Sequence, residues 1–352
     1  MEELGATGIV CDDELSPAQL NNLEKELDCK VMDRTLIILD IFAARANTSE
    51  GNIQVELAQL RYRAARLVGL RNSLSRLGGG IGTRGPGEKK LETDRRLIRT
   101  RISALKAELA QVEKHRELIR GKRSRGNLKT AAIVGYTNAG KSTLLNTLTG
   151  AGILAEDKLF ATLDPTTRVL ELKDGQQILL TDTVGFIRKL PHHLVEAFKS
   201  TLEEAKYADI ILHVVDASNP QMDEQMYTVY ETLQNLGVKD KPVITVFNKI
   251  DRMEDTWVPR DLRADYHVKI SAKTGEGITG FLQSIEAVLR ERKVEIEALY
   301  PYKEAGKIQK IRKYGELQEE EYREDGIFVR AFVPAELYGQ VRPEGVTPNN
   351  CL

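Results

Sequence analysis

The chain has 352 residues, of which 41% are hydrophobic and 29% charged, and this length predicts roughly two or three globular domains. Its three cysteines form no C-x-x-C pair, so we expect a reducing, cytoplasmic setting without disulfides or a zinc site, and no signal peptide or membrane span is visible. The net charge of −1 conceals an asymmetry, because residues 51–126 hold 19 Lys and Arg against 7 Asp and Glu, which indicates a polyanionic partner.

Residues 1–49 are predicted to form a strand, a helix, a second strand and a second helix, over 7–10, 16–27, 30–32 and 36–46. Ser16 is a good N-cap, Pro17 suits the first helical turn, and Gln19 completes a capping box. Two strands and two helices make a thin core. Either this part packs on its neighbours, or the chain begins partway through a larger α/β domain.

Residues 50–126 are predicted to form an antiparallel helical hairpin, because apolar residues follow a heptad spacing on both arms. The two seams are Ile53, Leu57, Leu60, Ala64, Leu67 and Leu74, and Ile98, Ile102, Leu105, Leu109, Val112 and Ile119. Arg71 and Arg116 interrupt them. Between the arms, the glycine-rich tip over 78–90 is predicted not to be helical.

Basic side chains gather at and just beyond this tip, and they are candidate RNA contacts: Arg84, Lys89, Lys90, Arg95, Arg96 and Arg99. Glycines permit close approach of the backbone to phosphates, and arginine stacks on unpaired bases. The alternative is that these residues form only a solvated face, on a hairpin that serves as a spacer. Charge and shape favour RNA over that alternative.

Residues 127–294 alternate apolar strands with amphipathic helices, which is typical of a mostly parallel, doubly wound sheet. The expected strands cover 130–135, 177–182, 210–216, 243–248 and 267–271. Residues 295–352 form a small C-terminal α+β part, with a strand over 326–333 and a helix or strand over 303–314. The predicted fold class is therefore α/β, with a partial α/β domain and a helical hairpin before the doubly wound domain.

The loop after the first of these strands fits the phosphate-binding pattern G-x-x-x-x-G-K-[ST]. Backbone N–H groups of this loop and of the helix that follows can bind phosphate oxygens. The residues concerned are Gly135, Tyr136, Thr137, Asn138, Ala139, Gly140, Lys141, Ser142 and Thr143. Lys141 can neutralise the β- and γ-phosphates, and the Ser142 hydroxyl can ligate Mg²⁺. Asn138 either helps to bind a monovalent cation such as K⁺ or stabilises the loop through an Asx turn.

A second group of residues is expected to sense Mg²⁺ and the γ-phosphate. Asp182 and Gly185 fit D-x-x-G at the end of a strand, where the carboxylate can hold Mg²⁺ and the glycine N–H can meet the γ-phosphate. Thr162, which follows Phe160 closely, is the best candidate for a mobile threonine that binds Mg²⁺ only with a triphosphate. Thr166 and Thr167 remain rivals for that role. Lys141, Thr162 and Gly185 are thus the expected catalytic residues.

The third group reads the base. Asn248, Lys249 and Asp251 fit N-K-x-D, and the Asp251 carboxylate can accept two hydrogen bonds from guanine that adenine cannot donate. Asn248 is expected to brace the loops and Lys249 to lie over the base. In the segment Ser271, Ala272 and Lys273, the Ala272 N–H can meet guanine O6. Together these motifs predict a switch that binds GTP and GDP with Mg²⁺.

Phe186 occupies the position after Gly185, where many small GTPases carry a glutamine that orients the attacking water. Phenylalanine cannot do this, so intrinsic hydrolysis is expected to be slow until a partner supplies a catalytic group. His192 and His193 lie nearby, but adjacent histidines at a helix start are more often exposed than catalytic.

The chain resembles the HflX family of ribosome-associated GTPases, in the Obg–HflX superfamily. The resemblance runs over about residues 5–292, through the glycine-rich stretch 79–96, the phosphate loop 134–143, the segment 159–165 and the D-x-x-G segment 182–188. Family members usually carry several dozen more residues before position 5, so the chain is expected to be truncated. The family pattern favours Thr162 as the switch threonine and has a hydrophobic residue at the position of Phe186.

The resemblance implies binding to the large ribosomal subunit, with the loop 78–90 near rRNA of the peptidyl-transferase region. It also implies GTP hydrolysis stimulated there and the splitting or rescue of stalled ribosomes under stress. We expect a monomer that binds no DNA. Two alternatives stay open: an RNA-binding or RNA-remodelling protein in which nucleotide is mainly structural, and a GTPase that acts on tRNA or a protein partner.

Overall fold

The computed structural model divides into two compact units, Met1–Ile278 and Thr279–Leu352. It describes residues 5–75, 86–125, 128–150, 165–173, 175–188, 202–254, 260–291 and 293–343. Within these ranges no helix combines the length and the apolar character that crossing a membrane requires. Phe160, Thr162, His192, His193 and the tip residues up to Arg84 lie outside the described residues. The division into four domains stays a prediction.

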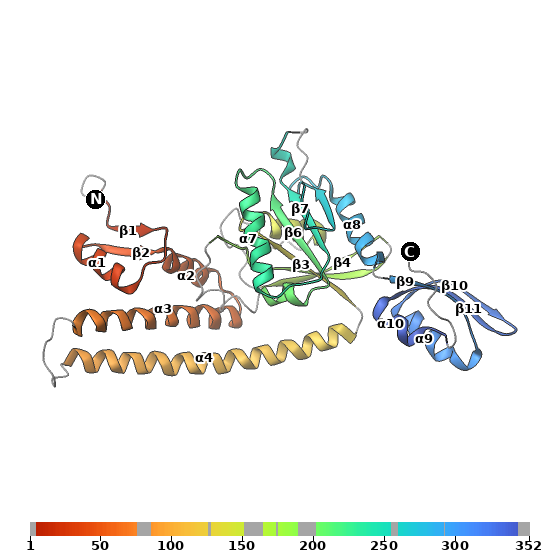
Figure 1. Ribbon diagram of the computed structural model, residues 1–352, viewed down its shortest axis with the longest axis horizontal. Coiled ribbons are helices and arrows are strands. Elements are labelled where there is room, and N and C mark those ends of the chain that lie inside the picture. Colours follow the sequence, from red (N-terminus) through yellow and green to blue (C-terminus); the bar gives the residue numbers. More distant parts are fainter. Residues whose placement is uncertain are drawn as a thin grey trace. The chain divides into compact units, whose positions relative to one another are not determined.

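The N-terminal part has the order predicted from the sequence: β1 (Gly8–Cys11), α1 (Pro17–Leu27), β2 (Lys30–Asp33) and α2 (Arg34–Arg45) (Figure 1). The two strands pair in parallel, with Gly8 opposite Lys30. The expected capping box forms, because the Ser16 hydroxyl accepts from the Gln19 N–H and the Gln19 side chain accepts from the Ser16 N–H. The capping signal therefore located the start of α1 correctly.

The hairpin consists of α3 (Ser49–Ser75) and α4 (Pro86–Arg125), which run side by side (Figure 1). Leu57 and Leu105 of the two predicted seams are buried, and Arg116, which interrupts one seam, pairs with Glu50 at 2.9 Å. On the outside, Arg101 makes a bidentate ion pair with Glu56. The hairpin is thus held by apolar contacts and flanking ion pairs.

One expectation about the hairpin is wrong, because α4 begins at Pro86, so residues 86–90 of the predicted irregular tip are helical. Proline favours the first helical turn, where its missing N–H has no partner to lose, and after Gly87 the residues Glu88, Lys89 and Lys90 are good helix formers. Pro86 thus begins a helix here.

The central sheet of the first unit has the strand order β4-β5-β3-β6-β7-β8 among the described residues. Its strands are β3 (Lys129–Gly135), β4 (Thr166–Glu171), β5 (Gln177–Asp182), β6 (Ile210–Asp216), β7 (Val243–Asn248) and β8 (Tyr266–Lys269). Five were predicted, and their neighbours pair in parallel. The strand β4 was not predicted, and it pairs antiparallel with β5 at the sheet edge.

Helices of the same unit follow these strands, namely α5 (Lys141–Thr149), α7 (Met222–Asn235) and the 3₁₀ turn Ile250–Arg252, with a further helical stretch at 202–207. Figure 1 shows α7 lying across one face of the sheet. Because the parallel strands point the same way, the loops that follow β3, β5, β6, β7 and β8 meet at one edge, where ligands bind in such sheets.

The N-terminal part packs on this domain, as the first of the two alternatives for its thin core expects. One buried apolar cluster joins Phe42 of α2 and Tyr62 of α3 to Val134, Phe186 and Ile211. The face of α3 that carries Val55, Ala58 and Tyr62 belongs to this cluster and lies outside the predicted seam. The helix α3 is therefore buried on two sides, against α4 and against α1 and α2.

A buried carboxylate organises this junction. Asp33 is fully buried and accepts hydrogen bonds from the N–H groups of Leu15 and Leu36, from the Tyr62 hydroxyl at 2.6 Å and from Arg66 at 2.8 Å. Since a buried charge needs such partners, Asp33 ties β2, α2 and α3 into one piece.

The second unit begins with α8 (Ile278–Glu291) and continues with a three-stranded antiparallel sheet of order β10-β11-β9. The strands are β9 (Lys293–Tyr300), β10 (Glu316–Arg323) and β11 (Gly326–Pro334), and the helices α9 (Ala305–Tyr314) and α10 (Ala335–Val341) follow β9 and β11. The segment 303–314 was predicted as helix or strand, and it is helical from Ala305. Ile308 and Ile311 of α9 pack in a core with Tyr300 and Val329.

Candidate functional site

The phosphate loop turns from β3 into α5 through two glycines that have no room for a side chain. A Cβ at Gly135 would lie 2.2 Å from the Val214 carbonyl oxygen, and one at Gly140 would lie 2.2 Å from Asn248 Nδ2. Gly140 also has a left-handed φ of 95°. The loop can therefore keep this path only with glycine at both positions.

The first turn of α5 presents Lys141, Ser142 and Thr143 at the helix N-terminus. The N-cap residue Gly140 has no side chain that could cap the first N–H groups, which suits this end of the helix to binding an anion. The Lys141 ammonium is buried and donates to the carbonyl oxygens of Gly135 and Tyr136 at 3.3 and 3.0 Å. Burial lowers the pKa of Lys141 to about 8, against the opposing effect of the Asp182 carboxylate. The site thus places the Lys141 ammonium next to the N-terminus of α5.

Ser142 and Asp182 come together although they are forty positions apart in the chain. The Ser142 hydroxyl donates to Asp182 Oδ2 at 2.7 Å, and Asp182 is fully buried at the end of β5. A hydroxyl and a carboxylate are oxygen ligands of the kind that Mg²⁺ takes beside a phosphate. The donor set therefore fits Mg²⁺.

Gly185 lies against the phosphate loop. A Cβ on Gly185 would approach Thr137 Cα to 2.8 Å and the Lys141 ammonium to 3.1 Å, so this close approach also requires glycine. Two backbone bonds fix it there: Thr137 N–H donates to the Phe186 carbonyl at 2.8 Å, and Phe186 N–H donates to the Gly135 carbonyl at 3.0 Å.

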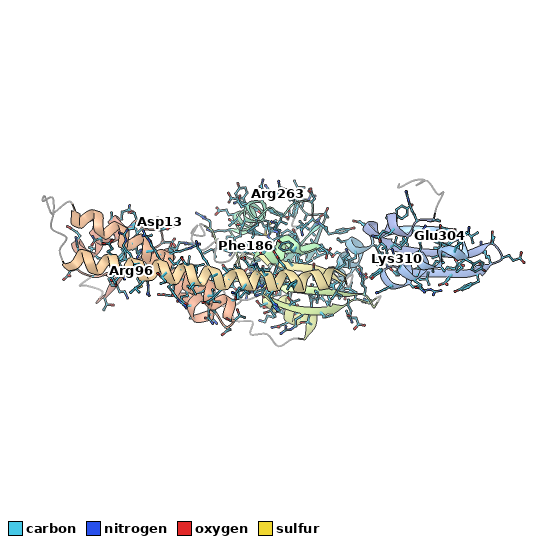
Figure 2. The ribbon with its side chains drawn as sticks, turned by 90° about the horizontal axis from the view of Figure 1, so that it is seen from below. Asp13, Arg96, Phe186, Arg263, Glu304 and Lys310 are labelled. Carbon is cyan, nitrogen blue, oxygen red and sulfur yellow. The ribbon has the colours of Figure 1, made fainter. Side chains whose placement is uncertain are left out.

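Phe186, labelled in Figure 2, is 2% exposed and belongs to the apolar cluster formed with α2 and α3. Nearby, an Arg34 guanidinium from α2 donates to the Arg188 carbonyl at 2.9 Å. The residue at the position of the missing glutamine is therefore a core residue, and it anchors the D-x-x-G segment to the N-terminal helices.

The rival threonines differ in what the structure shows. Thr167 Oγ1 lies 3.0 Å from Thr181 Oγ1, directly across the β4–β5 pair, and Thr166 lies opposite Asp182. Both stand at the start of a regular strand. Thr162 and Phe160 lie outside the described residues, so the choice of Thr162 stays a prediction.

The residues predicted to read the base form a connected network at the ends of β7 and β8. Asn248 is buried, donates to the Ala139 carbonyl at 2.9 Å and accepts from the Ala272 N–H at 2.9 Å. The Ser271 hydroxyl donates to Asp251 Oδ1 at 2.7 Å, and this bond is the largest cause that lowers the pKa of Asp251. Lys273 lies exposed beside them. The Ser271 bond favours the ionised form of Asp251, which its predicted role as an acceptor of two hydrogen bonds requires.

Lys249 adopts a left-handed φ of 66° and links three loops. Its ammonium donates to the Asn138 carbonyl at 2.8 Å and to Asp216 Oδ2 at 2.7 Å. The sequence motifs did not single out Asp216, although its place at the end of β6, beside the ends of β3 and β7, was a signal. Asn138 has a left-handed φ of 64° and is exposed, and none of the described residues donates a hydrogen bond to its side chain, so the Asx turn gains no support.

The six basic residues of the hairpin are placed unequally. Arg95, Arg96 and Arg99 lie on α4, where Arg96 is labelled in Figure 2 and is exposed together with Arg99. Lys89 and Lys90 belong to the first turns of α4, and their side chains, like Arg84, are outside what the structure describes. The described members therefore lie on one helix, well away from the phosphate loop in the sequence.

Comparison with known families gives three consecutive matches. Residues 1–43 match the family described as GTP-binding GTPase N-terminal, residues 45–123 match the GTP-binding GTPase Middle Region, and residues 130–249 match the 50S ribosome-binding GTPase family. The third match contains the phosphate loop, the D-x-x-G segment and the start of N-K-x-D.

Three curated relatives are similar over most of the chain, and each is described as a GTPase HflX. The relative from Lacrimispora saccharolytica is 73% identical over 96% of this chain and 80% of its own length. The relative from Caldanaerobacter subterraneus is 53% identical over 97% and 79% of the two chains. The relative from Escherichia coli is 50% identical over 80% and 67%.

Proposed function

This chain belongs to the HflX family of GTPases, and we propose that it hydrolyses GTP on the large ribosomal subunit, as a switch that splits or rescues stalled ribosomes. The observation that supports this proposal most directly is that one chain contains both a nucleotide site and a basic hairpin. A nucleotide site of the GTPase type is preceded by a basic helical hairpin, and the site domain matches a family described as ribosome-binding.

At the site, we assign the phosphates to the N–H groups of the loop 135–143 and to Lys141. Ser142 and Asp182 would hold Mg²⁺, with Thr162 joining them, and Mg²⁺ when bound neutralises charge on the β- and γ-phosphates. Gly185 would donate its N–H to the γ-phosphate. Asp251 and the Ala272 N–H would read guanine, and Asn138 would contribute to a K⁺ site.

The catalytic group for water attack comes from the partner in this proposal. Phe186 carries no proton-accepting atom and is held in the apolar cluster, so it cannot orient water. Intrinsic turnover is then slow and becomes fast when rRNA or a ribosomal protein completes the site. This arrangement links hydrolysis to the correct ribosomal complex.

The hairpin supplies the RNA contact. Residues 51–126 carry an excess of twelve positive charges, and each Lys or Arg that neutralises a phosphate releases counterions, so binding should weaken steeply with salt. Arg84, Lys89, Lys90, Arg95, Arg96 and Arg99 would contact rRNA near the peptidyl-transferase region. The protein would act as a monomer in the cytoplasm.

The test compares ribosome binding and GTP turnover for two variants. One replaces Arg95, Arg96 and Arg99 with alanine, and the matched control replaces Lys106 and Lys114, which are exposed basic residues farther along α4. We expect the first variant to bind large subunits more weakly and with a shallower salt dependence, with unstimulated GTPase activity preserved. Equal binding by both variants would reject the hairpin contact. Binding of tRNA instead of subunits, or no response to nucleotide, would favour the alternatives.

A further inference from the structure

We infer that Asp216 is a positioning residue for guanine nucleotides, which acts by fixing the side chain of Lys249. The two side chains form an ion pair of 2.7 Å, and both are mostly shielded, at 13% and 17% exposed. An ion pair removed from water is screened less than a surface pair, so its geometry is well defined. Asp216 itself matches no part of the five nucleotide-binding motifs.

The Lys249 side chain is fixed both at its backbone and at its ammonium group. Its backbone stands in the left-handed region, directly after Asn248 at the end of β7. Its ammonium is held by Asp216 on one side and by the Asn138 carbonyl on the other. A lysine stem fixed at both ends cannot explore other rotamers, so the apolar stem is preorganised as a platform next to Asp251.

Asp216 is itself rigidly placed. It stands opposite Asn248 in the β6–β7 pair, and the Ala217 N–H donates to the Asn248 carbonyl at 3.0 Å. Its second oxygen, Oδ1, accepts from the Ser218 N–H at 3.1 Å and from the Ser218 hydroxyl at 2.7 Å. One oxygen thus serves the local turn, and the other serves Lys249.

Because the two carboxylate oxygens of Asp216 have different partners, two explanations of its role can be tested separately. If Asp216 only shapes the turn, then loss of the Ser218 hydroxyl bond and loss of the Lys249 bond should have similar effects. If Asp216 positions Lys249, then only substitutions that remove the bond from Oδ2 to Lys249 should alter nucleotide affinity. They should have this effect only while the Lys249 ammonium is present.

The experiment measures the affinity and dissociation rate of fluorescent N-methylanthraniloyl-GDP on the full chain. The variants are Asp216→Asn, which keeps an acceptor for the turn, Lys249→Met, which keeps the stem, and the double variant. Ser218→Ala is the matched control. We expect Asp216→Asn to weaken binding on the order of tenfold, mainly through faster dissociation, and Ser218→Ala to bind as the parent does.

The double variant decides the mechanism, because two residues that act through one contact are not additive. We expect Asp216→Asn to have little further effect when Lys249 is already methionine. Full additivity, unchanged affinity in Asp216→Asn, or equal losses in Asp216→Asn and Ser218→Ala would each overturn the inference. Asp216→Ser, which also keeps an acceptor, replaces the asparagine variant if that variant does not fold.

Discussion

Replacing Phe186 with glutamine tests how the D-x-x-G segment is held, because glutamine is the residue that many small GTPases carry there. Phe186 is 2% exposed in the cluster with α2 and α3. Removing a buried phenylalanine ring costs roughly 1.5–3 kcal/mol of transfer free energy, and a buried amide without partners costs roughly 1–3 kcal/mol more. We therefore expect Phe186→Gln to destabilise the first unit by about 4 kcal/mol without faster intrinsic hydrolysis.

The assay combines urea denaturation, followed by circular dichroism, with unstimulated GTP turnover. Phe186→Leu is the control, because it keeps an apolar side chain and should cost only about 1 kcal/mol. A glutamine variant that hydrolyses GTP faster than the parent at unchanged stability would refute the reasoning. Such a result would mean that the side chain at this position faces the nucleotide rather than the core.

Three further predictions concern the loop, the interior and the hairpin. Gly140→Ala should abolish nucleotide binding in an equilibrium titration, because its Cβ would collide with Asn248, and near-normal affinity would contradict the geometry. Burial lowers the pKa of His213 to about 4 from 6.5, so the unfolded chain binds more protons between these values, and stability should fall by up to about 3 kcal/mol as pH drops from 7 to 4. In His213→Gln the loss of stability between pH 7 and 4 should be smaller by this amount in denaturation curves. An unchanged loss would mean that other groups cause it. Leu105→Ala should destabilise the hairpin by roughly 2–5 kcal/mol in thermal denaturation, since this side chain is fully buried, and a change below about 1 kcal/mol would contradict its packing.

The sequence was sufficient to predict those elements whose position depends on a short segment alone, such as a helix cap or an apolar run. The capping box at Ser16 located a helix start, and apolar runs located five strands of the central sheet. Lys141 lies at the start of α5, and Asp182 and Asn248 lie at the ends of β5 and β7, as their motifs require. The function of each such residue stays a prediction.

Other features depend on contacts between distant segments, and the sequence pattern could not reveal them. The strand β10 has four glutamates in eight residues, which disfavours a strand assignment, yet β11 supplies its hydrogen-bond partners. The second buried face of α3 belongs to the cluster that also contains Phe42 and Phe186, and no heptad rule anticipates it. Asp216 becomes meaningful only when β6 lies beside β7 and brings its carboxylate to Lys249.

The start of α4 is instructive for a different reason. A run of glycines and a proline was interpreted as irregular through Lys90, but proline disrupts helices only in their interior. At Pro86 the same residue begins a helix. The position of proline relative to the helix-forming residues that follow it was the deciding signal.

The central claim is that the ribosome completes the catalytic site of this GTPase. The most direct measurement is GTP turnover by the purified chain with and without large ribosomal subunits, at one salt concentration. The account predicts slow turnover alone and strong stimulation by subunits, which is reduced in the variant lacking Arg95, Arg96 and Arg99. Turnover that is equally fast with and without subunits, in protein shown to be folded and nucleotide-bound, would contradict it.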